Sequence, residues 1–147
     1  MVKNPYAFVL DCSVTMSWCF DDESNDYSDA ILDNLKNSTA IVPTIWPLEV
    51  ANVLLLAKRK KRLTEIQASS FIDALSALPI VIDPSTSTRA MHTIFMLAQQ
   101  SNLTIYDAAY LELALREEIP LLTLDQSLIN AAKKLHIPVQ MGNMKSK

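Results

Sequence analysis

Short apolar runs alternate along this chain with longer stretches in which apolar residues recur every three or four positions. The short runs are Tyr6–Leu10, Ala40–Thr44, Pro79–Asp83, Ile119–Asp125 and residues 137–141. They have the length and the Val, Ile and Leu content of strands buried on both faces of a parallel sheet. The pattern therefore predicts five short strands.

The stretches between these runs have helical periodicity. Pro47 suits the first turn of one helix and Thr64 the N-cap of the next. Helices are predicted within residues 21–35, 47–63, 64–78, 87–102, 104–118 and 126–135. Strands that alternate with helices indicate an α/β fold, in which helices flank a mostly parallel five-stranded sheet.

Composition bounds the class of protein. A chain of 147 residues that is 50% hydrophobic and 20% charged has enough apolar residues for one domain with a single core. The single glycine, Gly142, excludes a Gly-rich phosphate loop, and residues 142–147 are expected to form an unstructured tail. No apolar run is long enough to span a membrane, and Asp11 interrupts the first run before it could serve as a signal peptide. A cytoplasmic location is the expectation.

The cysteines and histidines do not form a recognisable site. Cys12 and Cys19 have no further Cys or His at ligand spacing, which argues against a zinc site and a disulfide framework. His92 falls in a predicted helix and His136 just before the last predicted strand. Both are interpreted as structural or surface residues.

Acidic residues stand where strands end and helices begin. Asp11 and Asp125 each terminate an apolar strand, and Glu49 lies in the first turn of the helix after the second strand. Parallel strands end at one edge of a sheet, where the sites of such folds lie. These three acids are therefore expected there, whereas Asp107, near a helix start after Thr104, follows a helix and is not placed by local sequence.

Two interpretations of these acids compete. Each acid by itself could be a helix cap, because carboxylates are favoured at helix N-termini. Caps, however, need not be brought together, and clustered carboxylates raise one another's pKa or require a cation. The cation suited to such oxygen ligands is Mg²⁺ or Mn²⁺, which supports displacement at phosphorus.

Four ordered motifs carry a resemblance to a known family. They are FVLDCSV, PLEVANVL, LTIYDAAYLELA and IPLLTLDQSLINAAKKL. Together they resemble the PIN domain, and more specifically the VapC-type toxins of bacterial toxin–antitoxin pairs. The resemblance runs from about Phe8 to Met141, so residues 1–141 are interpreted as one PIN domain of three layers.

The resemblance implies a Mg²⁺- or Mn²⁺-dependent endoribonuclease that cleaves RNA such as tRNA or rRNA. Its four acids correspond to Asp11, Glu49, Asp107 and Asp125, which would be both catalytic residues and metal ligands. Its small hydroxyl residues correspond to Ser13 and Thr123. The family's fold would also bring Asp107 to the carboxyl edge. The implied partners are RNA, a small VapB-like antitoxin and a second copy of the chain.

A basic run offers a candidate RNA contact. The net charge of −3 requires any nucleic-acid contact to be local, and Lys58, Arg59, Lys60, Lys61 and Arg62 form the densest positive cluster. The alternative is a solvated helix end. Trp18 and Trp46 could stack on bases but are expected to be buried, and the acids at residues 21–23 form either a solvated loop or a rim of the site.

Three other functions compete with the ribonuclease. A haloacid-dehalogenase-type phosphatase would use Asp11 as nucleophile but needs a second Asp where Ser13 stands. A non-catalytic PIN-like or receiver-like module would not need four acids. A DNA nuclease of related architecture would use the same acids, which do not distinguish RNA from DNA.

Overall fold

The sheet of this protein, described by a computed structural model over residues 4–142, contains four parallel strands in the order β3-β2-β1-β4. They are β1 (Phe8–Leu10), β2 (Ala40–Pro43), β3 (Ile80–Asp83) and β4 (Leu121–Leu122). Val9 pairs with both Ile41 and Leu121, so β1 lies inside the sheet. All four strands end at the same edge, as predicted for a parallel α/β fold.

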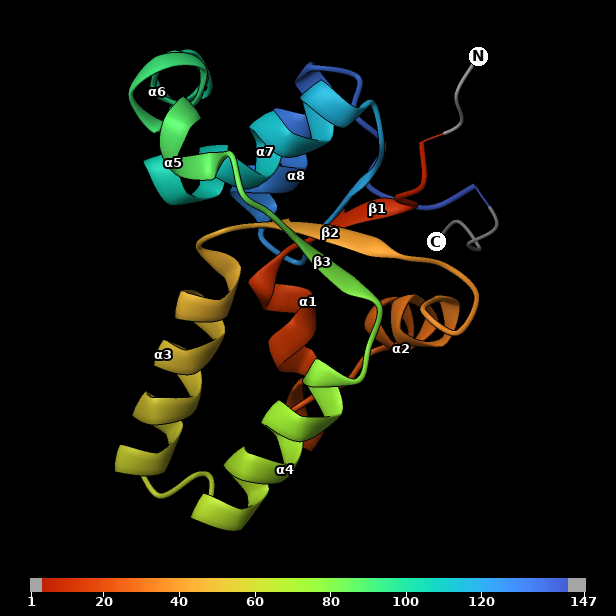
Figure 1. Cartoon of the computed structure of the whole chain (residues 1–147), viewed down its shortest axis with the longest axis vertical. Coiled ribbons are helices and arrows are strands. Elements are labelled where there is room, and N and C mark those ends of the chain that lie inside the picture. Colours follow the sequence, from red (N-terminus) through yellow and green to blue (C-terminus); the bar gives the residue numbers. More distant parts are fainter. Residues whose placement is uncertain (1–3, 143–147) are drawn as a thin grey trace.

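Helices cover both faces of this sheet. Figure 1 shows α1 to α4 on one side and α5 to α8 on the other, which gives three layers. The first group is α1 (Cys12–Ser17), a 3-10 turn η1 (Asp21–Glu23), α2 (Asp26–Asn34), α3 (Trp46–Arg59) and α4 (Glu65–Ser76). The second group is α5 (Thr86–Arg89), a π-helical segment η2 (Ala90–Ile94), α6 (Phe95–Ser101), α7 (Ile105–Glu117) and α8 (Gln126–Lys134).

The prediction of a fifth strand at residues 137–141 is wrong. The Leu121 N–H donates to the Pro138 carbonyl at 2.9 Å, so the segment runs beside β4. Pro138 has no N–H to return a bond, and the Val139 carbonyl accepts instead from the Tyr27 hydroxyl at 2.6 Å. These side-chain and single backbone bonds replace a regular ladder.

One predicted helix boundary also changes. The helix predicted over residues 47–63 ends at Arg59, because the chain turns through Lys61, whose φ is 60°. Thr64 then caps α4 with a capping box to Gln67, as its sequence indicates.

Of the predicted tail at residues 142–147, all but Gly142 lie outside the described residues. The unstructured tail and the 1–141 domain boundary therefore stay predictions.

Helix α7 is the central element of the core. Its residues from Ala108 to Ala114 are all buried, because one side packs on β1 and β2 and the other on α6, η2 and α8. Phe8, Val9 and Leu10 in β1 are fully buried beneath it. A helix enclosed on all sides is held rigidly. No helix within residues 4–142 has the length and apolar character required to cross a membrane.

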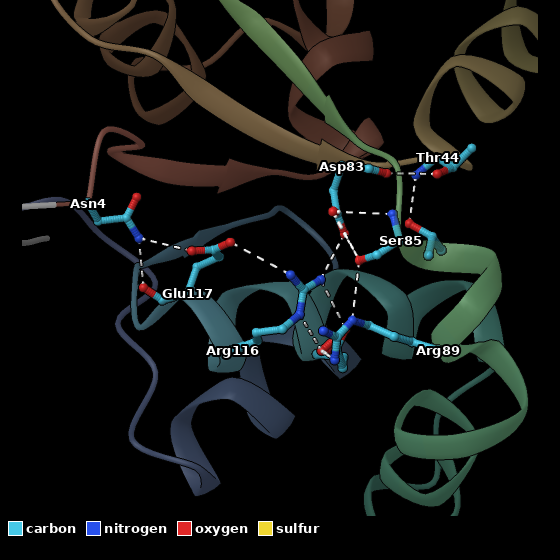
Figure 2. A network of polar contacts seen from close by, with 9 residues as sticks. Asn4, Thr44, Asp83, Ser85, Arg89, Arg116 and Glu117 are labelled. Carbon is cyan, nitrogen blue, oxygen red and sulfur yellow. Dashed lines mark hydrogen bonds and ion pairs between the residues drawn. The ribbon is translucent and has the colours of Figure 1, made fainter. Parts of the chain in front are cut away.

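A buried ion-pair network joins the edge strand β3 to α7. Arg116 Nη2 lies 2.7 Å from Asp83 Oδ2, and Arg116 Nε lies 2.9 Å from Glu112 Oε2. Figure 2 shows Arg116 and Asp83 together with Ser85, whose hydroxyl donates to Asp83, and with Arg89. Arg89 in turn approaches Glu112 at 3.9 Å. Burial opposes ionisation of Asp83, but the bonds from Arg116 and Ser85 outweigh it and lower the Asp83 pKa. The network fixes the end of a strand that has only one neighbour.

Removing Arg116 should therefore destabilise the fold. The change Arg116→Ala leaves the buried carboxylate of Asp83 without a cation and Glu112 with only its longer contact to Arg89. We expect a loss of about 3 kcal/mol in the free energy of unfolding. Urea unfolding at pH 7 measures it. Lys36→Ala, which breaks an exposed pair with Asp33, is the control and should cost below about 0.5 kcal/mol. Equal losses in the two variants would contradict a stabilising network.

Candidate active site

Asp11 follows the last residue of β1 and is buried, with 5% of its surface exposed. Its carboxylate oxygen Oδ2 accepts hydrogen bonds from the Ser13 hydroxyl at 2.6 Å and the Thr123 hydroxyl at 2.8 Å. Asp11 occupies the N-cap position of α1, but its side chain makes no capping bond. The simple cap interpretation therefore does not apply to this residue.

Glu49 reaches the same region from the first turn of α3. It is half-buried, and its Oε1 accepts a hydrogen bond from the Tyr110 hydroxyl of α7 at 2.5 Å. The start of α3 is held against α1 by a second bond, from the Trp46 indole N–H to the Thr15 hydroxyl at 3.0 Å. Side chains of neighbouring elements thus determine where the carboxylate lies.

Asp107 and Asp125 come from the starts of α7 and α8. The backbone N–H of Asp107 donates to Thr104, which caps α7, so the Asp107 carboxylate is not itself the cap. Asp125 does cap α8, because its Oδ1 accepts from the Leu128 N–H at 3.0 Å. The two interpretations of the acids are therefore not exclusive: Asp125 caps a helix with one oxygen and retains a second.

Electrostatic coupling shows that the four acids lie near one another. Burial is the largest cause that raises the pKa of Asp11, and Asp125 raises it further. Burial likewise raises the pKa of Glu49, with smaller contributions from Asp11 and Asp107. Burial and then Asp125 and Asp11 raise the pKa of Asp107. Ser13 and Thr123 oppose this effect at Asp11, as Tyr110 does at Glu49, because donors favour the charged carboxylate.

The chemistry of this donor set fits a hard divalent cation. Four carboxylates supply oxygen ligands, and a divalent cation would offset their repulsion. In the part of the chain that the structure describes, no three His, Cys, Asp or Glu side chains are grouped closely enough to hold one ion as they stand. Each of the four acids acts electrostatically on at least one other, and their side chains would have to move for them to share an ion.

The predicted basic run lies away from these acids. Lys58 is nine residues after Glu49 on the same helix, which is about 14 Å along the axis. Lys58 pairs with Glu65, and Arg62 pairs with Asp22 and Glu23 while it covers the Phe20 ring at 4.3 Å. Arg59, Lys60 and Lys61 are exposed. The acids at residues 21–23 therefore neighbour the basic run and not the four-acid site.

The remaining candidate residues behave as ordinary structural groups. Trp46 is buried, and the Trp18 indole N–H donates to the Ser28 carbonyl, so neither ring is presented for base stacking. Burial raises the pKa of Cys12 to about 12, which makes it an unreactive thiol. His92 and His136 are exposed.

The sequence alone did not reveal Tyr110 or the Asp83–Arg116–Glu112 network. A signal for Tyr110 was present, because a residue three positions after Asp107 lies on the same face of a helix. Its partner Glu49, 61 residues away, was not predictable from spacing.

Comparisons with known proteins agree with this architecture. The family model described as PIN domain matches residues 8–134. The chain is 36% identical over 99 residues to Ribonuclease VapC1 of Mycobacterium tuberculosis, in strains CDC 1551 / Oshkosh and H37Rv, which covers 66% of this chain and 71% of those proteins.

Two solved structures share the fold. PAE2754 from Pyrobaculum aerophilum has a TM-score of 0.65 at 20% identity, covering 86% of this chain and 80% of that one. VapBC2 from Rickettsia felis, bound to a DNA fragment from their promoter, has a TM-score of 0.56 at 17% identity, covering 92% and 96%.

The charge on Asp11 should destabilise the metal-free protein. Because the Asp11 pKa is raised in the folded state, the folded protein binds this proton more tightly than the unfolded chain. Stability is then greatest below the unfolded pKa of about 3.9 and falls as pH rises through the folded value. In EDTA at pH 7, Asp11→Asn should raise the free energy of unfolding by on the order of 1 kcal/mol.

Urea unfolding of the two proteins at several pH values measures this difference. The gain should shrink as pH falls toward 4, because protonation progressively removes the charge on Asp11 of the wild type. Asp73→Asn, at an exposed position of α4, is the matched control and should change stability little. A destabilised Asp11→Asn protein at pH 7 would show that the charge is compensated within the protein.

Proposed function

The chain belongs to the PIN domain family, and on this basis we propose that it is a metal-dependent endoribonuclease, the toxin of a type II toxin–antitoxin pair. The observation that carries the proposal is the hydrogen bonding that joins the segments with the four acids: Asp11 bonds to Thr123, two residues before Asp125, and Glu49 to Tyr110, three residues after Asp107. These acids come from four separate segments of the chain. Its similarity to Ribonuclease VapC1 supports RNA as the substrate.

In this proposal the four acids hold Mg²⁺ or Mn²⁺. When bound, the ion would lower the pKa of a water molecule and offset the negative charge on the phosphate. The hydroxyls of Ser13 and Thr123 orient Asp11 and favour the charged form of its carboxylate, and Tyr110 does the same for Glu49. Water adds across the bond between phosphorus and the 3′ oxygen, which leaves a 3′-hydroxyl and a 5′-phosphate, the products that the family resemblance implies.

A VapB-like antitoxin is the proposed partner. Supporting it is an apolar groove of about 340 Å³ between α3, α4 and β3, lined by Trp46, Val50, Leu54, Ile72 and Ile82 among others. The side chains of Ile72 and Ile82 are 48% and 45% exposed there, as expected for a surface that a partner covers. VapBC2 of Rickettsia felis, similar in fold, is bound to a DNA fragment from their promoter. A homodimer is also expected from the family.

The competing phosphatase is not favoured by the site. Such an enzyme needs a second acid two residues after the nucleophile, and Ser13 at that position donates a hydrogen bond to Asp11 instead. Measurement of RNA cleavage and metal binding distinguishes the ribonuclease from a non-catalytic module.

RNA cleavage should depend on Asp107 and on the metal. Purified protein is incubated with labelled tRNA and with a structured RNA in Mg²⁺ or Mn²⁺, and internal cuts are mapped on gels. Asp107→Asn should slow cleavage by at least about 100-fold, as EDTA should, because one carboxylate of the donor set is lost. Asp73→Asn is the exposed control and should cut at the wild-type rate.

Near-normal cleavage by Asp107→Asn would overturn the assignment of this acid. Absence of cleavage together with absence of metal binding by calorimetry would favour the non-catalytic module. Cleavage of single-stranded DNA in place of RNA would change the substrate class.

The exposed part of the basic run is proposed to contact RNA phosphates. The double variant Lys60→Gln and Lys61→Gln should weaken RNA binding and reduce the slope of log affinity against log salt by about 0.7 for each lost contact. Fluorescence anisotropy at several salt concentrations measures both. Lys133→Gln with Lys134→Gln, at the end of α8, is the charge-matched control. An unchanged slope in the first variant would exclude the run from the RNA interface.

A further inference from the structure

We propose that Tyr110 is a positioning residue of the four-acid site, whose hydroxyl holds Glu49 in the place where it binds the divalent ion. The inference rests on the proposed function and deepens it, because it assigns to the site a residue outside the four acids. Tyr110 would not touch the metal or the RNA. It would act through Glu49.

The geometry of the hydrogen bond is the first observation. The Tyr110 hydroxyl donates to Glu49 Oε1 at 2.5 Å, a short bond of the kind made to charged carboxylates. The bond joins α7 to α3, which are not adjacent in sequence. It occupies one oxygen of Glu49 and leaves the lone pairs of Oε2 out of this bond.

The support behind the hydroxyl is the second observation. Tyr110 is fully buried and is the largest of the completely enclosed side chains. It lies in the buried middle of α7, between Ala108 and Ala114, three residues after Asp107 and therefore on the same helix face. A rigid ring on a rigid helix fixes the distance between the acid of α3 and the acid of α7.

The choice of acceptor is the third observation. A buried tyrosine hydroxyl needs an acceptor, but a backbone carbonyl satisfies this need, as the Val139 carbonyl does for Tyr27. Tyr110 instead meets a half-buried carboxylate in a region where Asp11 is also close enough to act on it electrostatically. Asp11 has the same arrangement, since Ser13 and Thr123 donate to it. Hydroxyl donors thus support both Asp11 and Glu49.

The test compares Mg²⁺ binding by calorimetry in wild type, Tyr110→Phe, Glu49→Gln and the double variant. Tyr110→Phe keeps the ring and removes the donor, and we expect Mg²⁺ affinity to fall by about 10-fold or more. In the Glu49→Gln background the same change should alter affinity by less than about twofold, because the residue through which Tyr110 acts is already neutral. Trp18→Phe, which removes the bond to the Ser28 carbonyl, controls for loss of stability and should keep wild-type affinity.

A Tyr110→Phe protein that binds Mg²⁺ as wild type does would overturn the inference and leave the proposed function intact. A double variant whose loss of Mg²⁺ affinity equals the product of the losses in Tyr110→Phe and Glu49→Gln would also overturn it, because the two residues would then act independently. Wild-type protein that binds neither Mg²⁺ nor Mn²⁺ would instead overturn the proposed metal site, and the inference with it.

A measurement on the wild type covers the case in which Tyr110→Phe does not fold. The protein has four tyrosines, so ¹³C labelling at the phenol carbon gives four resonances that can be assigned. Addition of Mg²⁺ should shift the Tyr110 resonance, because the charge on its acceptor changes. A Tyr110 resonance that stays constant while Mg²⁺ binds would show that the two are not coupled.

Discussion

Repulsion between carboxylates gathered at one edge of the sheet is the constraint on which the site depends. Asp11, Glu49 and Asp107 are each partly or fully buried, and burial and neighbouring carboxylates raise the pKa of each. Ionisation of these groups therefore opposes folding. Hydroxyl donors from Ser13, Thr123 and Tyr110 reduce this cost without removing it. A site of this kind favours a divalent cation, because each carboxylate attracts the ion and the bound ion relieves the repulsion between the carboxylates.

The surrounding fold tolerates this repulsion because its framework is rigid. The parallel strands bring Asp11 and the segment before Asp125 together, and α7, buried on all sides, carries Asp107 and Tyr110 on one face. At the open edge of the sheet, where β3 has one neighbour, Arg116 ties Asp83 to Glu112. The two charge clusters differ in one respect. Arg116 forms ion pairs within the second, whereas no ion pair joins the acids of the first to a Lys or Arg among residues 4–142.

Helix α3 connects the candidate active site to the proposed partner surface. Its first turn carries Glu49, and Trp46, Val50 and Leu54 of the same helix line the apolar groove. A partner seated in the groove would therefore pack against the helix that positions one of the acids.

Local sequence predicted most of the strands and helices, and it predicted where three of the four acids lie relative to the sheet. Alternation of apolar runs and helical periods predicted the parallel α/β fold, and the strand ends placed Asp11, Glu49 and Asp125 at one edge, because parallel strands finish together. The fifth strand failed because Pro138 lacks the N–H that a ladder requires, although the run itself has strand composition. Tertiary structure alone decided the rest: the approach of Asp107, the bond between Tyr110 and Glu49, and the separation of the basic run from the acids. Helical and strand periods reflect neighbours a few residues apart, whereas these contacts join segments whose proximity results only from packing of the whole chain.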